Sequence, residues 1–474
     1  MKKGFFLILG ICIILIFYLL CKNEDLTAVN FRMAGKNASE LQKVIDYYKS
    51  SQQQGKLDCA YFLIRNMYGK SSLEYSFLDS TGRVMLLDTC SALKNHQSIK
   101  SIIRKGQFVN RTVKSDLAHI TADFLIENIE LAFEVRNKYS WCKHLTKEEF
   151  YATILPYRIK NEPLSNWRSF YYHKYKNVAD SLEHSHAKTE DVVFYFNTHH
   201  GKRYIGDADC LLGEQTYQMA EVMGGGTCDH LALNAALLLR AIGIPLQLDV
   251  IPYHGKVNGG HVYNSFTNEE GEFVYFSPYE REPERKLWVA PVVYRIQFKE
   301  PIRESVTQYY YKTTHVKLSE KDLCLAVFNR GKFRKIMNAE KEGDSSLFKN
   351  VACDLLYFPM KERSDSLIPS NTFPFIINKE GQISFIKPSP KEFIASPTIK
   401  LYDAKRVITL KDEPYILFGW NRGWNFISKG NPCDSTSIDF GSIPNYGLFL
   451  VCGNSRMERM QRPFIITDHI QVCY

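Results

Sequence analysis

Residues 224–250, GGGTCDHLALNAALLLRAIGIPLQLDV, decide the fold. Residues 231–242 are apolar nearly all round, which is typical of a helix buried in a core. Thr227 favours the N-cap, so we expect Cys228 in the first helical turn, and Gly243 with Pro245 should end the helix. The alternation in residues 246–250 then predicts a strand.

The position of Cys228 makes it a candidate nucleophile. At a helix start, the unpaired backbone N–H groups and the helix dipole favour a thiolate over a thiol. The same N–H groups can stabilise an oxyanion, and Gly224–Gly226 let a substrate carbonyl approach the backbone closely. The alternative interpretation is that Cys228 is only a small buried hydrophobe.

His261 is the candidate base. A loop that contains Gly and Asn follows the first strand, and residues 260–266, GHVYNSF, alternate again. His261 should therefore open a second strand that pairs beside the first, with its ring near the start of the cysteine helix. A histidine within reach of a cysteine can activate it for nucleophilic attack.

Together these segments resemble the transglutaminase-like superfamily. That family has a Gly-x-Cys helix start, an Arg-Ala-x-Gly-Ile-Pro helix end and a histidine on the following strand, as residues 226–245 and 259–266 do here. Residues 155–168 are similar to the lead-in of bacterial, membrane-anchored members. The resemblance implies a papain-like α+β core in which Cys228 attacks an amide carbonyl of a peptide or glycoprotein, and His261 protonates the leaving amine.

The third member of the site is where the chain departs from the family. The aspartate that usually orients the histidine is replaced by Ser277, which can accept a hydrogen bond but cannot balance an imidazolium charge. Glu280 or a neighbour such as Glu282 can take this role, and so can Asn264, as in papain-like sites. A site with no third member is a further alternative.

The N-terminus predicts export and a membrane tether. Residues 4–20 are uncharged and apolar and follow Lys2 and Lys3, which is typical of a signal segment or an uncleaved anchor. Cys21 stands where a bacterial lipoprotein would be lipidated. We therefore expect a protein of the bacterial cell envelope, either an outer-membrane lipoprotein or signal-anchored, with the remaining chain outside the cytoplasm. Disulfides are permitted there, but the sequence does not assign their pairing.

The fold class expected is α+β, in four parts. Residues 1–21 form the targeting segment, and residues 30–185 read as mainly helical, with Leu41, Val44, Ile45 and Tyr48 at helical spacing. Residues 186–300 hold the transglutaminase-like core. Residues 310–474 show hairpin signals, apolar stretches around turns at 329–331, 378–381 and 421–423, and predict a β-sandwich-like module.

Other features argue against metal, cofactor and nucleic acid. His199 and His200 lack a nearby carboxylate or cysteine at ligand spacing, so we interpret them as part of a solvated loop. The net charge of +9 is spread without a basic run, which disfavours nucleic-acid binding. No cofactor is expected. Trp420 and Trp424 can form a platform for a sugar or peptide, but burial in the sheet core is favoured.

The sequence thus predicts a membrane-tethered, cysteine-dependent amide hydrolase or acyl transferase. Hydrolysis is preferred because water is always available. The main alternative is a catalytically impaired scaffold whose β module binds glycan or peptide at the cell surface, and a purely structural envelope lipoprotein is a third hypothesis.

Overall fold

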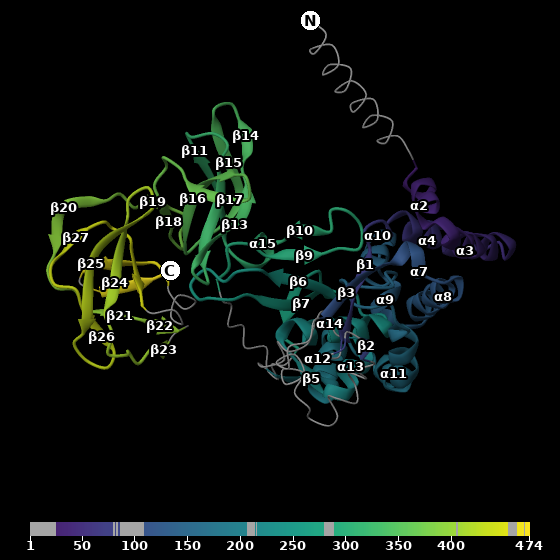
Figure 1. Ribbon diagram of the computed structural model, residues 1–474. Helices are drawn as coiled ribbons and strands as arrows, with labels where there is room; N and C mark the ends of the chain where they lie inside the picture. Colours follow the sequence, from purple (N-terminus) through teal and green to yellow (C-terminus); the bar gives the residue numbers. More distant parts are fainter. Residues whose placement is uncertain are drawn as a thin grey trace, which may run out of the picture. The chain divides into compact units, whose positions relative to one another are not determined.

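The computed structural model describes residues 25–78, 81, 84–85, 109–205, 214, 216–278, 289–403, 406–453, 462–468 and 470–474 (Figure 1). With 32% of the chain in helices and 33% in strands, the predicted mixture of α and β structure is confirmed. The chain forms two compact units. Unit 1 comprises Met1–Leu248, Tyr263–Pro283 and Ile296–Arg303, and unit 2 comprises Asp249–Val262, Glu284–Arg295 and Glu304–Tyr474.

The first part of unit 1 is mainly helical, as expected. The four residues predicted to face the core, Leu41, Val44, Ile45 and Tyr48, are the buried residues of α3. A capping box between Thr146 and Glu149 begins α10. The helices are α2 (Leu26–Ala34), η1 (Gly35–Asn37), α3 (Ala38–Ser50), α4 (Gln54–Arg65), α7 (Asp116–His119), α8 (Ala122–Lys138), α9 (Ser140–Lys143) and α10 (Lys147–Thr153).

This region also contains a small sheet that the helical interpretation did not include. Its antiparallel strands β1 (Ser71–Leu78), β2 (Val84–Met85) and β3 (Val109–Ser115) lie in the order β2-β1-β3. Seven residue pairs join β1 to β3, from Ser71 opposite Ser115 to Phe77 opposite Val109. The sheet therefore depends on pairing between segments far apart in the sequence.

The cysteine helix α14 (Cys228–Ala241) follows three further helices. Eleven of its 14 residues are buried, which confirms the predicted core helix. The other helices are α11 (Trp167–His184), α12 (Thr189–His200) and α13 (Tyr217–Met223). A five-stranded sheet, in the order β10-β9-β6-β7-β8, contains the strands β6 (Gln247–Ile251), β7 (His261–Thr267), β8 (Phe273–Phe276), β9 (Tyr294–Ile296) and β10 (Arg303–Ser305). The two strands predicted after the helix, β6 and β7, are neighbours in this order.

From Thr313 onward the described residues of unit 2 contain strands and no helix, after the short α15 (Thr307–Tyr310), so the predicted β-rich region is confirmed. Its last sheet has seven strands, in the order β21-β26-β25-β24-β28-β29-β30, and is nearly closed like a barrel. The strands are β11 (Thr313–Leu318), β12 (Cys324–Asn329), β13 (Lys332–Asn338), β14 (Glu340–Glu342), β15 (Ser345–Ala352), β16 (Leu355–Arg363), β17 (Ser366–Pro369), β18 (Phe375–Ile377), β19 (Ile383–Phe385), β20 (Ser389–Ile394), β21 (Ile399–Lys400), β22 (Tyr402–Asp403), β23 (Arg406–Val407), β24 (Tyr415–Trp420), β25 (Trp424–Pro432), β26 (Ser437–Asp439), β27 (Ile443–Asn445), β28 (Phe449–Cys452), β29 (Phe464–Thr467) and β30 (Ile470–Cys473).

The three predicted hairpins are present, as β12–β13, β18–β19 and β24–β25. In the first, Arg330 and Gly331 form a two-residue turn with φ angles of 51° and 71°. Positive φ at both positions is the geometry of a type I′ turn, which matches the twist of the flanking strands.

The paired tryptophans belong to the sheet core, as favoured from the sequence. Trp420 is 3% exposed, and its ring meets that of Trp424 at 5.1 Å and 82°. Phe358 also packs edge-on against Trp420 at 5.1 Å. These contacts bury the faces that a sugar platform would need to expose.

Within the described residues, no helix is long and apolar enough to cross a membrane. The predicted signal or anchor at 4–20 and the lipidation candidate Cys21 lie outside those residues. None of the eight cysteines in the described part of the chain forms a disulfide.

Candidate active site

Cys228 lies where the sequence placed it, at the first residue of α14, with Thr227 as the N-cap in an extended conformation. Its side chain is partly exposed to solvent. Most of the helix behind it is buried, so the N-terminal turn carries the reactive group on a rigid support. The geometry gives a thiol that a reagent can reach and that sits at the positive end of a helix dipole.

The glycines before Cys228 bring the chain's own backbone close. Arg203 N donates to Gly224 O at 2.9 Å, and Ile205 N donates to Gly226 O at 2.8 Å. A Cβ on Gly225 would lie 2.2 Å from Arg203 O. We predicted that a substrate carbonyl approaches the backbone at these glycines. Part of that space is occupied by the backbone of residues 203–205.

His230 locks the start of the helix. The backbone N–H of Thr227 donates to His230 Nδ1 at 3.4 Å, and Thr227 Oγ1 lies 3.2 Å from the same nitrogen. His230 is 7% exposed, and a Cβ on Gly226 would lie 2.7 Å from His230 Cβ. His230 therefore caps the helix, and only glycine fits at position 226 without displacing it.

An ion cluster lies beside the nucleophile. Lys160 Nζ is 2.8 and 2.7 Å from the two carboxylate oxygens of Asp229, and 2.6 Å from Glu214 Oε1. Burial alone would lower the pKa of Lys160, but Asp229 and Glu214 hold it above its usual value. Lys160 was not singled out in the sequence. Its only signal is its place inside the lead-in at 155–168, two residues before the buried Glu162.

The lead-in motif is structural. The buried guanidinium of Arg168 donates to Asn128 Oδ1 at 2.8 Å, to Pro156 O at 3.0 Å and to Arg240 O at 3.3 Å. Arg240 Nε in turn donates to Leu246 O at 2.7 Å. These arginines satisfy backbone carbonyls at the C-terminal end of α14 and in the loop after α10, so the shared motif fixes the helix that carries Cys228.

His261 belongs to unit 2, where it is the first residue of β7. The preceding glycines are needed by geometry: Gly259 has φ of 99°, and a Cβ on Gly260 would lie 2.5 Å from Ile251 O. The ring of His254 lies 6.4 Å from that of His261, with 26° between the planes. Burial lowers the pKa of both histidines to about 4, and His254 adds to the effect on His261. His261 is consequently neutral at pH 7, and its burial disfavours the protonated form.

His254 is a neighbour of His261 that sequence reasoning missed. It lies in the loop between β6 and β7 and is 6% exposed. A lone histidine in a loop carries no sequence signal for a site, and only the proximity of the two rings distinguishes it.

The candidates for the third member differ in their surroundings. Asn264 is fully buried in unit 1, and its Nδ2 donates to Ala232 O and to Gln247 O, each at 3.1 Å. Because strand side chains alternate between faces, Asn264 and His261, three residues apart on β7, point to opposite sides. Ser277 is 2% exposed directly after β8, and Glu280 lies outside the described residues. The identity of the orienting residue stays a prediction.

Cys228 and His261 belong to different units, so their pairing also stays a prediction. Inside unit 1, a hydrogen bond joins strand β7 to helix α14. Asn264 of β7 donates to Ala232 O, one turn after Cys228.

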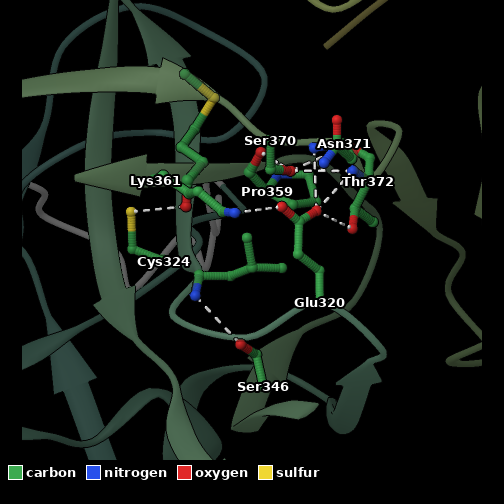
Figure 2. Close-up of polar contacts among 10 residues, drawn as sticks. Glu320, Cys324, Ser346, Pro359, Lys361, Ser370, Asn371 and Thr372 are labelled. Atoms are coloured by element: carbon green, nitrogen blue, oxygen red, sulfur yellow. Dashed lines mark hydrogen bonds and ion pairs between the residues drawn. The ribbon is translucent and has the colours of Figure 1, made fainter. Parts of the chain in front are cut away.

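A second polar cluster, in unit 2, is centred on Glu320 (Figure 2). The carboxylate of Glu320 lies 2.7 Å from Lys361 Nζ and accepts from Asn371 N, Thr372 N and Thr372 Oγ1, each at 3.0 Å. Burial would raise the pKa of Glu320, but the donors Lys361 and Thr372 hold it below its usual value. The cluster therefore fastens residues 370–372 to the loop that carries Glu320.

Across the described residues, no group of three or more His, Cys, Asp or Glu side chains could hold a metal ion. The predicted solvated loop at His199 and His200 is wrong: both residues form the last turn of α12. His199 Nδ1 lies 2.9 Å from Tyr195 O, one turn earlier in the same helix.

Comparison with known proteins returned no match. No protein-family model, no curated protein and no solved structure matches this chain. The likeness to the transglutaminase-like superfamily accordingly rests on the motif residues around Cys228 and His261.

Proposed function

We propose that this protein is a cysteine-dependent amide hydrolase or acyl transferase of the transglutaminase-like type, with Cys228 as nucleophile and His261 as base. The observation that carries the proposal is a partly exposed thiol at the first residue of an otherwise buried helix. A papain-like core, export and a membrane tether belong to the same proposal.

The proposed reaction proceeds in two acyl transfers. The neutral His261 takes the proton of Cys228 as the sulfur attacks the amide carbonyl, and backbone N–H groups at the start of α14 stabilise the oxyanion. The tetrahedral intermediate collapses to a thioester as His261 gives its proton to the leaving amine. Water, activated by His261, then attacks the thioester and releases a carboxylic acid and the thiol. An amine in place of water would give a new amide.

The low pKa of His261 bears on the missing aspartate. Burial holds this pKa at about 4, which disfavours a resting imidazolium. A neutral histidine has no resting charge to balance, but the imidazolium that forms when His261 takes the thiol proton meets Ser277 in place of the usual carboxylate. The same substitution is also the observation that favours the second candidate, a non-catalytic scaffold that binds peptide or glycan.

The test is the pH dependence of iodoacetamide alkylation in the full chain, read for each cysteine by peptide mass spectrometry. The exposed Cys433 provides a reference thiol in the same molecule. We expect Cys228 to react at lower pH than Cys433, because it begins α14, and to react more slowly in His261→Ala, which lacks the base. Cys228 that follows Cys433 in both proteins would exclude the enzyme and favour the scaffold.

A further inference from the structure

The side chain of Asn329 forms hydrogen bonds with the backbone of a single loop. This residue ends β12, is 1% exposed, and its Nδ2 lies 3.1, 3.2 and 3.3 Å from the carbonyl oxygens of His254, Val257 and Gly259. Its Oδ1 accepts from Gly259 N at 3.1 Å. The amide nitrogen and the amide oxygen of Asn329 thus both bond to one stretch of backbone, residues 254–259.

Two further contacts inside unit 2 hold the same stretch, which we call the histidine loop. Arg330 N, in the turn after β12, donates to Asn258 Oδ1 at 2.9 Å. The buried guanidinium of Arg462 donates to Gly255 O and to Phe328 O. The loop closes on itself where His254 N donates to Gly259 O at 2.8 Å.

The histidine loop leads directly into His261. It has no helix or strand of its own, so its backbone positions depend on the groups that bond to it. It carries His254 at one end and reaches Gly260 at the other, and the two histidine rings lie 6.4 Å apart. A change at Asn329 should therefore shift both histidine rings, although neither histidine is itself altered.

A purely structural role, completion of a buried turn, would require only that the loop's carbonyls be satisfied. The contacts of Asn329 do more, because they join the backbone of His254 to that of Gly259, two residues before His261. We propose that Asn329 is a positioning residue of the active site, which fixes the imidazole of His261 through the histidine loop. This inference rests on the proposed function and makes the β module part of the catalytic apparatus.

The experiment compares two isosteric changes in the full chain. Asn329→Asp keeps the acceptor but replaces the donor with an oxygen that faces carbonyls. Asn30→Asp is the matched control: Asn30 is also 1% exposed, and its Nδ2 donates to Ile64 O at 2.7 Å and Arg65 O at 3.1 Å. The readouts are carbethoxylation of His254 and His261, followed by peptide mass spectrometry, and the pH profile of Cys228 alkylation.

We expect Asn329→Asp to speed carbethoxylation of both histidines by about tenfold, the effect of losing one such hydrogen bond, and to abolish the His261-dependent part of Cys228 alkylation. Asn30→Asp should lower the melting temperature but leave both readouts at their wild-type values. Equal changes in the two variants, or none in Asn329→Asp, would overturn the inference.

Two outcomes need separate treatment. If Asn329→Asp fails to fold, Asn258→Ala removes the acceptor of Arg330 N at the edge of the loop and should shift both readouts in the same direction; unchanged readouts would overturn the inference. If the alkylation of Cys228 is the same with His261 as in His261→Ala, the proposed function fails. The carbethoxylation rates then decide separately whether Asn329 holds the loop, and unchanged rates would exclude that as well.

Discussion

Asn264 donates its side-chain amide to the main-chain oxygen of Ala232 at 3.1 Å, which ties β7 to the helix that begins with Cys228. The same nitrogen donates to Gln247 O of β6. One buried side chain thus joins three elements of the predicted core.

Replacement of Asn264 by alanine should lower the free energy of unfolding by about 2 to 3 kcal/mol, because two buried carbonyls lose their donor. Urea unfolding measures the change. Asn425→Ala is the control, since Asn425 donates to Asn421 O and Gly423 O on an exposed turn, and should cost less than about 0.5 kcal/mol. Similar losses in both variants would show that burial does not set the cost.

Gly226→Ala should destabilise the start of α14 by about 1 to 3 kcal/mol, because the new Cβ meets His230 Cβ at 2.7 Å. Alkylation of Cys228 should slow as His230 is displaced. Gly55→Ala in α4 is the control: its Cβ would meet only Phe133, at 3.7 Å, so we expect a gain of about 0.5 to 1 kcal/mol. Unaltered Cys228 reactivity in Gly226→Ala would contradict the locking role of His230.

The protein should lose stability as the pH falls from about 6.5 to 4. His254 and His261 have pKa values near 4 in the folded chain, below the usual 6.5, so the unfolded chain binds more protons in this range. Each histidine contributes at most about 3 kcal/mol, present in full above pH 6.5. Urea midpoints at several pH values measure the slope, and His254→Gln should flatten it. An equally steep slope in that variant would disprove the assignment to His254.

Lys160→Met should lower the free energy of unfolding by about 1 to 3 kcal/mol, because the carboxylate of Glu214, 19% exposed, and that of Asp229, 36% exposed, lose their cation. Alkylation of Cys228 should also slow, since unbalanced negative charge beside the helix start disfavours a thiolate. Lys188→Met breaks the exposed pair with Glu270 and should change stability by less than about 1 kcal/mol. If both variants unfold at the same urea concentration, the cluster around Lys160 contributes no net stability.

Local patterns predicted much of the fold. The start of α14 at Cys228, the strands after it and the hairpin turn at Arg330-Gly331 each depend on residues close in sequence, and each is present. The sheet formed by β1 and β3 was missed because its strands pair across more than thirty residues within a stretch dominated by helical spacing.

The candidate site was predictable only in its motif residues. Cys228 and His261 stand out because glycines and a helix cap frame them, whereas Lys160, His254 and Asn329 gain their meaning from contacts with distant residues. Asn329 bonds to a backbone carbonyl 75 positions earlier in the chain. No local periodicity encodes such a contact.

Segments of the two units alternate along the chain, and this limits which segments recombination can exchange. Unit 2 includes Asp249–Val262 from within the predicted core, and Asn329 bonds to that segment from the β module. An exchange of residues 310–474 as an independent cassette would deprive the segment before His261 of these bonds. Descendants that kept this segment in place would have to inherit the hairpin at 329–331 together with the core.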